Sequence, residues 1–89
     1  MQVFLNRCMA LEKSEQLPIA FGNRVKELRT AKGLTRQELA NRLNVERIQL
    51  ILIEDGKINT SLQMAYGLAK AFGVPLRELF DFDPEKIPS

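Results

Sequence analysis

The chain has 89 residues, which fits one small domain, and its 45% hydrophobic and 27% charged residues are typical of a globular protein. It contains no histidine and one cysteine, Cys8, which excludes an intramolecular disulfide framework and a cysteine-rich zinc site. No apolar run approaches the roughly 18 residues of a membrane span. We therefore expect a cytoplasmic protein that uses no metal or other cofactor.

Residues 1–18 form an extension before the first clear helical pattern. Its apolar residues fall roughly on one side of a helix, which predicts a short amphipathic helix containing Phe4, Leu5, Cys8, Met9 and Leu11. Two uses of this helix remain open: it folds over its own domain, or it is an arm exchanged with a second subunit. Pro18 is expected to mark its end.

A helical period continues from Ile19 to the pair Lys32-Gly33, where glycine suits the left-handed end of a helix. The main domain is predicted to span residues 19–82. Residues 83–89 contain two prolines among alternating charges, and they are interpreted as a flexible tail.

The segment from Thr35 to Gly56 predicts two short helices joined by a tight turn. Thr35 and Glu38 have the spacing of a capping box, so the first of these helices begins at Arg36 and runs to about Leu43. Asn44 suits the turn, because asparagine tolerates positive φ. The small Ala40 is predicted to lie where the two helices cross. The spacing of the apolar residues predicts that the following side chains point inward: Leu39, Leu43, Val45, Leu50 and Ile53.

The second helix of this unit, which is helix three of the chain, is predicted to begin near Glu46 and to end before Gly56. Its sequence IQLILI is also compatible with a buried strand, but no second strand-like segment is available to pair with it. Ser61 is a candidate N-cap for a fourth helix that Gly73 closes, and residues 76–80 form a short fifth helix. The predicted fold class is all-α, with five helices.

Positive charge is concentrated around the predicted two-helix unit. Residues 24–57 contain eight basic and five acidic residues, whereas residues 58–89 contain three basic and four acidic ones. A phosphate-binding face requires such a distribution, although a solvated surface of mixed charge accounts for it equally well.

Three segments together resemble the Cro and lambda-repressor-like, or XRE-type, helix-turn-helix family. These segments are FGNRVKELRTAKGLTRQELANRLNV, LILIEDGKINTSLQMAYGLAKAFGV and PLRELF, within residues 21–80. The resemblance implies a five-helix DNA-binding domain, usually dimeric, that acts as a transcriptional regulator.

The resemblance also implies roles for individual residues. The outward positions of helix three, which reach base edges in the major groove, are Arg47, Ile48, Gln49 and Leu52. The positions that contact DNA phosphates are Arg36, Lys57 and Asn59. Arg29 and Glu54 match a partly buried ion pair between the first helix, which follows Ile19, and helix three.

The leading hypothesis is a sequence-specific regulator of transcription, a repressor that binds an inverted repeat in double-stranded DNA as a homodimer. Candidates for the dimer surface, by apolar content, are Phe4, Leu5, Leu76, Leu79 and Phe80. The alternative is a protein-interaction module, such as an antitoxin or an adaptor. It is favoured by the unusually apolar helix three, in which Ile48, Ile51 and Leu52 cannot all point inward. An enzyme is not expected, because the chain lacks histidine and a glycine-rich phosphate loop.

Overall fold

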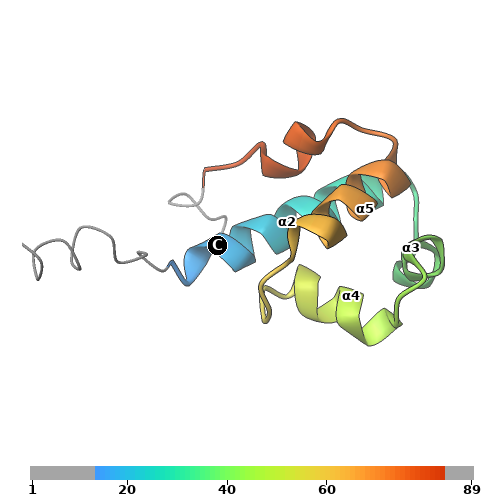
Figure 1. The fold of residues 1–89 in the computed structure, drawn as a ribbon, viewed down its shortest axis with the longest axis horizontal. Coiled ribbons are helices and arrows are strands. Elements are labelled where there is room, and N and C mark those ends of the chain that lie inside the picture. The colour runs from blue at the N-terminus through green and yellow to red at the C-terminus, as the bar shows by residue number, and fades with distance from the viewer. Residues whose placement is uncertain (1–13, 84–89) are drawn as a thin grey trace, which may run out of the picture.

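The computed structural model describes residues 14–83, and every regular element within them is helical (Figure 1). The elements are α2 (Gln16–Ala31), α3 (Arg36–Leu43), α4 (Arg47–Glu54), α5 (Leu62–Phe72) and the 3₁₀ helix η1 (Leu76–Phe80). The predicted all-α class is confirmed. The amphipathic helix proposed before residue 14, with Phe4 and Leu5, and the tail after residue 83 lie outside the described residues.

The first described helix starts earlier than the sequence predicted. α2 begins at Gln16, and the Ser14 hydroxyl accepts hydrogen bonds from the backbone N–H groups of Gln16 and Leu17, each at 3.2 Å. Pro18 therefore lies in the first turn of α2 and does not end a preceding helix, so that prediction is wrong. Proline is compatible with a first turn, because the N–H groups there have no partner within the helix.

Local sequence signals set the bounds of α3. The Thr35 hydroxyl accepts a hydrogen bond from the Glu38 N–H at 3.0 Å, and the Glu38 carboxylate accepts one from the Thr35 N–H at 2.8 Å. At the other end Asn44 adopts the left-handed conformation, with φ 58° and ψ 45°. The capping box, the turn and the helix bounds are confirmed.

The segment IQLILI is helical, which confirms the choice of helix over strand. Leu50 and Ile53 of α4 are buried and face α2 and α3. The α2 helix approaches α4 closely at Gly22, where an added Cβ would contact the carbonyl oxygens of Ile53 and Glu54. Only a glycine allows this approach, so Gly22 sets the position of α4.

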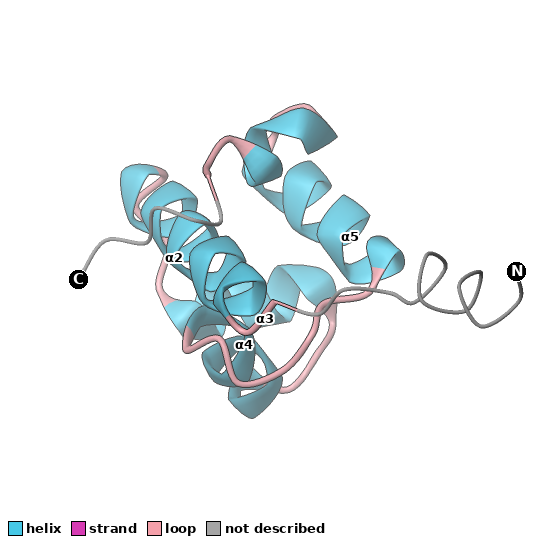
Figure 2. Ribbon diagram, turned by 90° about the vertical axis from the view of Figure 1, so that its left-hand side faces the viewer, coloured by secondary structure: helices cyan, strands magenta, loops and turns pink. Residues whose placement is uncertain are grey.

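The remaining elements cover the core. Ser61 caps α5 by accepting a hydrogen bond from the Met64 N–H at 3.0 Å, and α5 ends at Gly73, as predicted. The predicted fifth helix is the tighter 3₁₀ form, η1. It lies on the far side of α2 and α5 from α4 (Figures 1 and 2). The side chains that fill the core between these elements include Val25, Leu28, Leu39, Ala40, Leu50, Ile53, Leu68, Phe72 and Leu79.

Candidate nucleic-acid interface

The first turn of α4 presents polar and apolar side chains to solvent. Arg47, Ile48 and Gln49 are all exposed, and Ile48 is 59% exposed. The buried positions Leu50 and Ile53 turn the opposite side of the helix inward. An α-helix with its side chains is about 10–12 Å in diameter, so α4 fits the major groove of DNA, which is about 12 Å wide.

The apolar surface of α4 is smaller than the sequence suggested. Ile51 and Leu52 are half-buried, and Ile48 is the large hydrophobic residue of α4 that remains exposed. Leu52 lies one turn after Ile48, so its uncovered part continues the side on which Ile48 lies. This leaves one narrow apolar strip beside Arg47 and Gln49.

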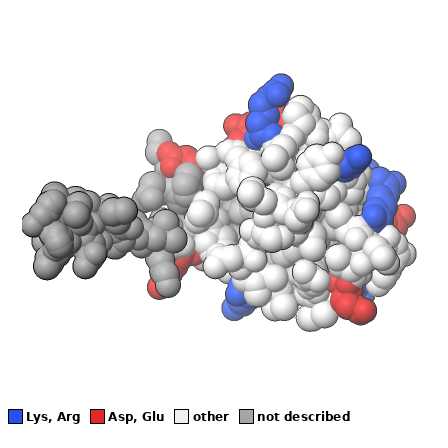
Figure 3. All heavy atoms as spheres, in the orientation of Figure 1, with Lys and Arg blue, Asp and Glu red and all other residues white. Residues whose placement is uncertain are grey.

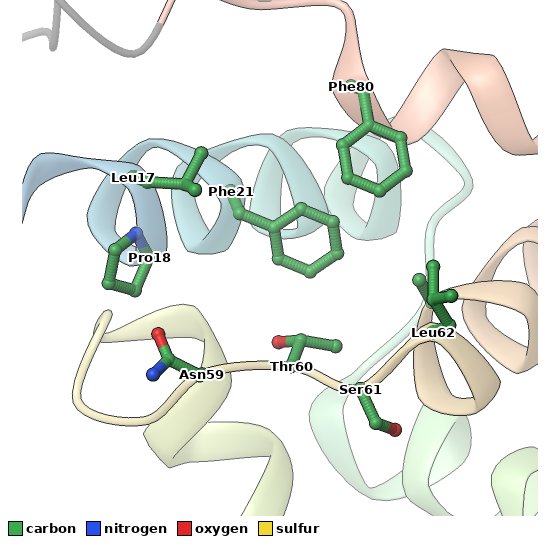
Figure 4. Close-up of a pocket in the computed structure, with 9 residues that line it drawn as sticks. Leu17, Pro18, Phe21, Asn59, Thr60, Ser61, Leu62 and Phe80 are labelled. Atoms are coloured by element: carbon green, nitrogen blue, oxygen red, sulfur yellow. The ribbon is translucent and has the colours of Figure 1, made fainter. Parts of the chain in front are cut away.

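The residues assigned to DNA phosphates lie around α4. Arg36 begins α3, where it lines a hollow together with Arg47 and contacts Glu54 at the end of α4, whereas Lys57 follows α4 and is exposed. Asn59 is exposed in the loop between α4 and α5. It also lines an apolar cavity, at the end of the cavity near Pro18 (Figure 4).

A buried carboxylate joins α2, α3 and α4. Glu54 accepts hydrogen bonds from Arg29 Nε at 2.7 Å and from Arg29 Nη2 at 3.1 Å, and the Glu54 side chain has no exposed surface. Arg29 Nη1 also donates to the Leu34 carbonyl at 2.9 Å. A third contact was not anticipated from the sequence: Arg36 Nε donates to Glu54 Oε1 at 2.9 Å. Arg36 and Glu54 lie 18 residues apart, and no local pattern indicates the pairing.

A shallow hollow of about 440 Å³ lies where these groups meet. Three arginines and the first turn of α3 contribute to it, and its lining is Arg29, Gly33, Leu34, Thr35, Arg36, Gln37 and Arg47. Glu54 neutralises one of the three guanidinium charges, so two positive charges remain. The unpaired N–H groups at the start of a helix add to this positive potential. The hollow therefore has the chemistry of a phosphate site.

The sequence did not indicate that Thr35 and Gln37 would share this hollow with Arg47. Their position at the start of a helix was the one signal of an anion site that the sequence offered, because amides at that position attract anions.

The capping box next to the hollow also affects the charge of Glu38. Hydrogen bonds from the backbone and hydroxyl of Thr35, with the nearby charge of Arg42, lower the pKa of the Glu38 carboxyl below its ordinary value.

A second surface, formed by α2, α5 and η1, is apolar. It contains a cavity of about 310 Å³ between Leu17, Phe21, Leu62 and Phe80 (Figure 4). Leu62 is 78% exposed, and Leu17, Tyr66, Leu76 and Phe80 are also exposed. In Figure 3 the face in view is largely uncharged, and both basic and acidic side chains lie at its rim. Of the predicted dimer residues, Leu79 is fully buried and is excluded from any surface.

Comparison with known proteins decides the family. A family model described as helix-turn-helix matches residues 25–79. The chain belongs to the helix-turn-helix family of transcriptional regulators. A protein of Archaeoglobus fulgidus described as an HTH-type transcriptional regulator is 39% identical over 64 residues, which are 72% of this chain and 91% of the relative.

This helix-turn-helix regulator is also related to restriction-modification controller proteins. The control protein C.MunI from Mycoplasma is 37% identical over 71 residues, which are 79% of this chain and 95% of that protein. The crystal structure of the controller protein C.AhdI from Aeromonas hydrophila superposes with a TM-score of 0.69 at 41% identity, covering 71% of this chain and 96% of C.AhdI.

Two further properties concern the described part of the regulator. None of its helices combines the length and the apolar character needed to cross a membrane. Residues 14–83 contain no group of three or more histidine, cysteine, aspartate or glutamate side chains arranged to bind a metal ion.

Proposed function

We propose that this regulator binds a specific inverted-repeat sequence in double-stranded DNA as a homodimer and represses transcription. One observation supports this most directly: the exposed first turn of α4 lies beside the arginine-lined hollow. A base-reading surface and a phosphate site thus share one face. The protein acts on DNA in the cytoplasm.

Each residue of that face has a distinct role in the proposal. Arg47 and Gln49 read bases through hydrogen bonds, since arginine pairs well with guanine and glutamine with adenine. Ile48 and the uncovered part of Leu52 contact thymine methyl groups. Arg36, Lys57 and Asn59 bind phosphates on either side of the groove, which fixes the register of α4 but reads no sequence.

The apolar surface on α2, α5 and η1 is the proposed dimer interface. Exposed leucine and aromatic side chains around a cavity are typical of a protein contact. The surface combines two predicted residues, Leu76 and Phe80, with Leu17, Leu62 and Tyr66. To occupy two successive major grooves, the two α4 helices of the dimer must lie about 34 Å apart, one turn of the duplex.

Repression needs no surface beyond these two. A dimer that occupies two successive major grooves blocks other proteins from the same stretch of DNA, and this occlusion is sufficient to prevent transcription there. The similarity to C.MunI and C.AhdI favours a more specific role, control of a restriction-modification system. The antitoxin or adaptor alternative is less favoured, because Ile51 and Leu52 are half-buried.

Selection from a library of random duplexes tests the proposal. The protein should enrich an inverted repeat whose half-sites are centred about 10 base pairs apart. A reporter promoter overlapping that repeat should lose activity when the protein is expressed. Enrichment of a single unrepeated site would contradict the dimer, and failure to enrich any sequence would contradict specific recognition.

A further inference from the structure

Glu54 contacts two arginines that the proposed function uses differently. Arg29 lies on α2, is nearly buried, and contacts both carboxylate oxygens of Glu54. Arg36 lies at the start of α3, and its side chain is 33% exposed. Glu54 therefore has two roles. It forms an ion pair that stabilises the core, and it also holds Arg36, a residue of the proposed DNA-binding face.

The contact leaves the end of the Arg36 side chain available. Only Nε of Arg36 donates to Glu54, and within residues 14–83 neither Nη group has another hydrogen-bond partner. The guanidinium is planar, so fixing Nε also fixes the plane in which the two Nη groups lie. Arg36 lines the hollow described above, which has the chemistry of a phosphate site, together with Arg47.

We infer that Glu54 is a positioning residue for DNA binding: it holds Arg36 through Nε so that the two Nη groups are oriented toward a backbone phosphate before DNA arrives. This inference rests on the proposed function. The buried carboxylate is itself fixed by Arg29, so the orientation of Arg36 is linked to the packing of α2 against α4. Arg36 does not lose the freedom of a long surface side chain when DNA binds.

A simple charge argument gives the opposite expectation. Glu54 is negative and close to the phosphate site, so its removal should strengthen DNA binding if charge alone mattered. Positioning predicts that its removal weakens binding, because Arg36 then loses its orientation. The direction of the effect separates the two explanations.

Substitution of Arg36 tests the inference without disturbing the buried pair. Arg36→Lys keeps the charge, but a lysine ammonium does not provide one donor for Glu54 and a fixed pair for a phosphate. We expect Arg36→Lys to bind duplex DNA roughly tenfold more weakly, as the removal of one charge-assisted hydrogen bond implies, and to resemble Arg36→Gln. The slope of log affinity against log salt should become shallower by roughly 0.9 for each phosphate that the variant no longer neutralises.

The probes are a labelled duplex from the region upstream of the gene and a scrambled duplex, and both should show the same reduction in affinity, because phosphate contacts do not read sequence. Arg77→Lys is the matched control, since Arg77 is exposed on η1 and does not line the hollow. An Arg36→Lys protein with wild-type affinity and salt dependence would overturn the inference.

A second arm examines Glu54 directly. Glu54→Gln should weaken DNA binding in the wild-type background but have little further effect when combined with Arg36→Lys. Equal reductions in both backgrounds, or tighter binding by a folded Glu54→Gln protein, would refute positioning. Circular dichroism establishes whether each variant is folded, and if Glu54→Gln is not, the comparison of Arg36→Lys with Arg36→Gln decides. If the wild-type protein shows no salt-dependent DNA binding, the proposed function itself fails.

Discussion

At the scale of single residues, Arg47 is the side chain on which sequence preference should depend most. It is exposed on the first turn of α4, and no carboxylate of residues 14–83 forms an ion pair with it, so it is available to bases. We expect Arg47→Ala to reduce the preference for the specific duplex over a scrambled one by about tenfold or more, because a bidentate contact contributes about 1–3 kcal/mol. Competition binding with the two duplexes measures this. An unchanged preference would show that Arg47 is not a base-reading residue.

Glu38 gives a pH dependence at the same scale. Its pKa is lowered in the folded protein, chiefly by the Thr35 backbone hydrogen bond. A carboxyl with a lowered folded-state pKa stabilises the fold above its unfolded pKa, and this contribution is lost as the pH falls through the folded pKa. The stability difference between the wild type and Glu38→Gln should therefore be present at neutral pH and disappear in the acidic range below an ordinary glutamate pKa. Urea unfolding at a series of pH values measures it, and a difference independent of pH would contradict the assignment.

At the scale of elements, the packing of α2 against α4 depends on Gly22. Replacing a glycine inside a helix by alanine normally stabilises it by about 0.5–1 kcal/mol. At Gly22 the new methyl group would collide with the backbone carbonyl oxygens of Ile53 and Glu54. The Glu54 oxygen lies 2.7 Å from the position of the added Cβ. We expect Gly22→Ala to lower the free energy of unfolding by about 1–3 kcal/mol and to weaken DNA binding by displacing α4.

Gly67 provides the matched control for this substitution. It also lies inside a helix, α5, but an added Cβ would meet a methyl group of the Leu43 side chain at 3.2 Å. A side chain moves more readily than backbone, so Gly67→Ala should be nearly neutral. Urea unfolding compares the two variants, and equal effects of Gly22→Ala and Gly67→Ala would refute the role given to the close approach.

The sequence predicted elements better than it predicted contacts between them. The bounds of α3 follow from the capping box at Thr35 and from Asn44, which are signals within a few residues of the helix ends. The start of α2 was misplaced because Pro18 is compatible with both the end and the first turn of a helix. The contact between Arg36 and Glu54 depends on how α3 and α4 pack, and the half-burial of Ile51 and Leu52 depends on tertiary packing, so local periodicity specifies neither.

At the scale of the whole molecule, we propose two functional surfaces, one for DNA and one for a partner subunit. Leu62 is the most exposed large hydrophobic residue of the described chain, at 78%, and lies at the edge of the apolar cavity (Figure 4). Leu62→Glu would bring two carboxylates close together in a symmetric dimer. We expect the wild type to sediment as a dimer at tens of micromolar, and this variant to sediment as a monomer and to bind the full inverted repeat more weakly.

Gln63→Glu is the control for Leu62→Glu, because it adds the same charge at the next position of α5, also exposed. This variant should remain a dimer. Sedimentation velocity on the two variants and the wild type measures the difference. A wild-type protein that is monomeric under these conditions would contradict the proposal that a dimer binds two half-sites.

The central claim is that the α3 and α4 face reads a specific DNA sequence, and fluorescence anisotropy at several salt concentrations tests it most directly. The probes are a duplex from the region upstream of the gene and a scrambled control. We predict a steep fall in affinity with salt and a preference of about a hundredfold or more for the upstream duplex, within the range of specific binding. Binding without preference would show that the protein contacts the DNA backbone but does not read its sequence. The absence of binding at low salt would contradict DNA binding altogether.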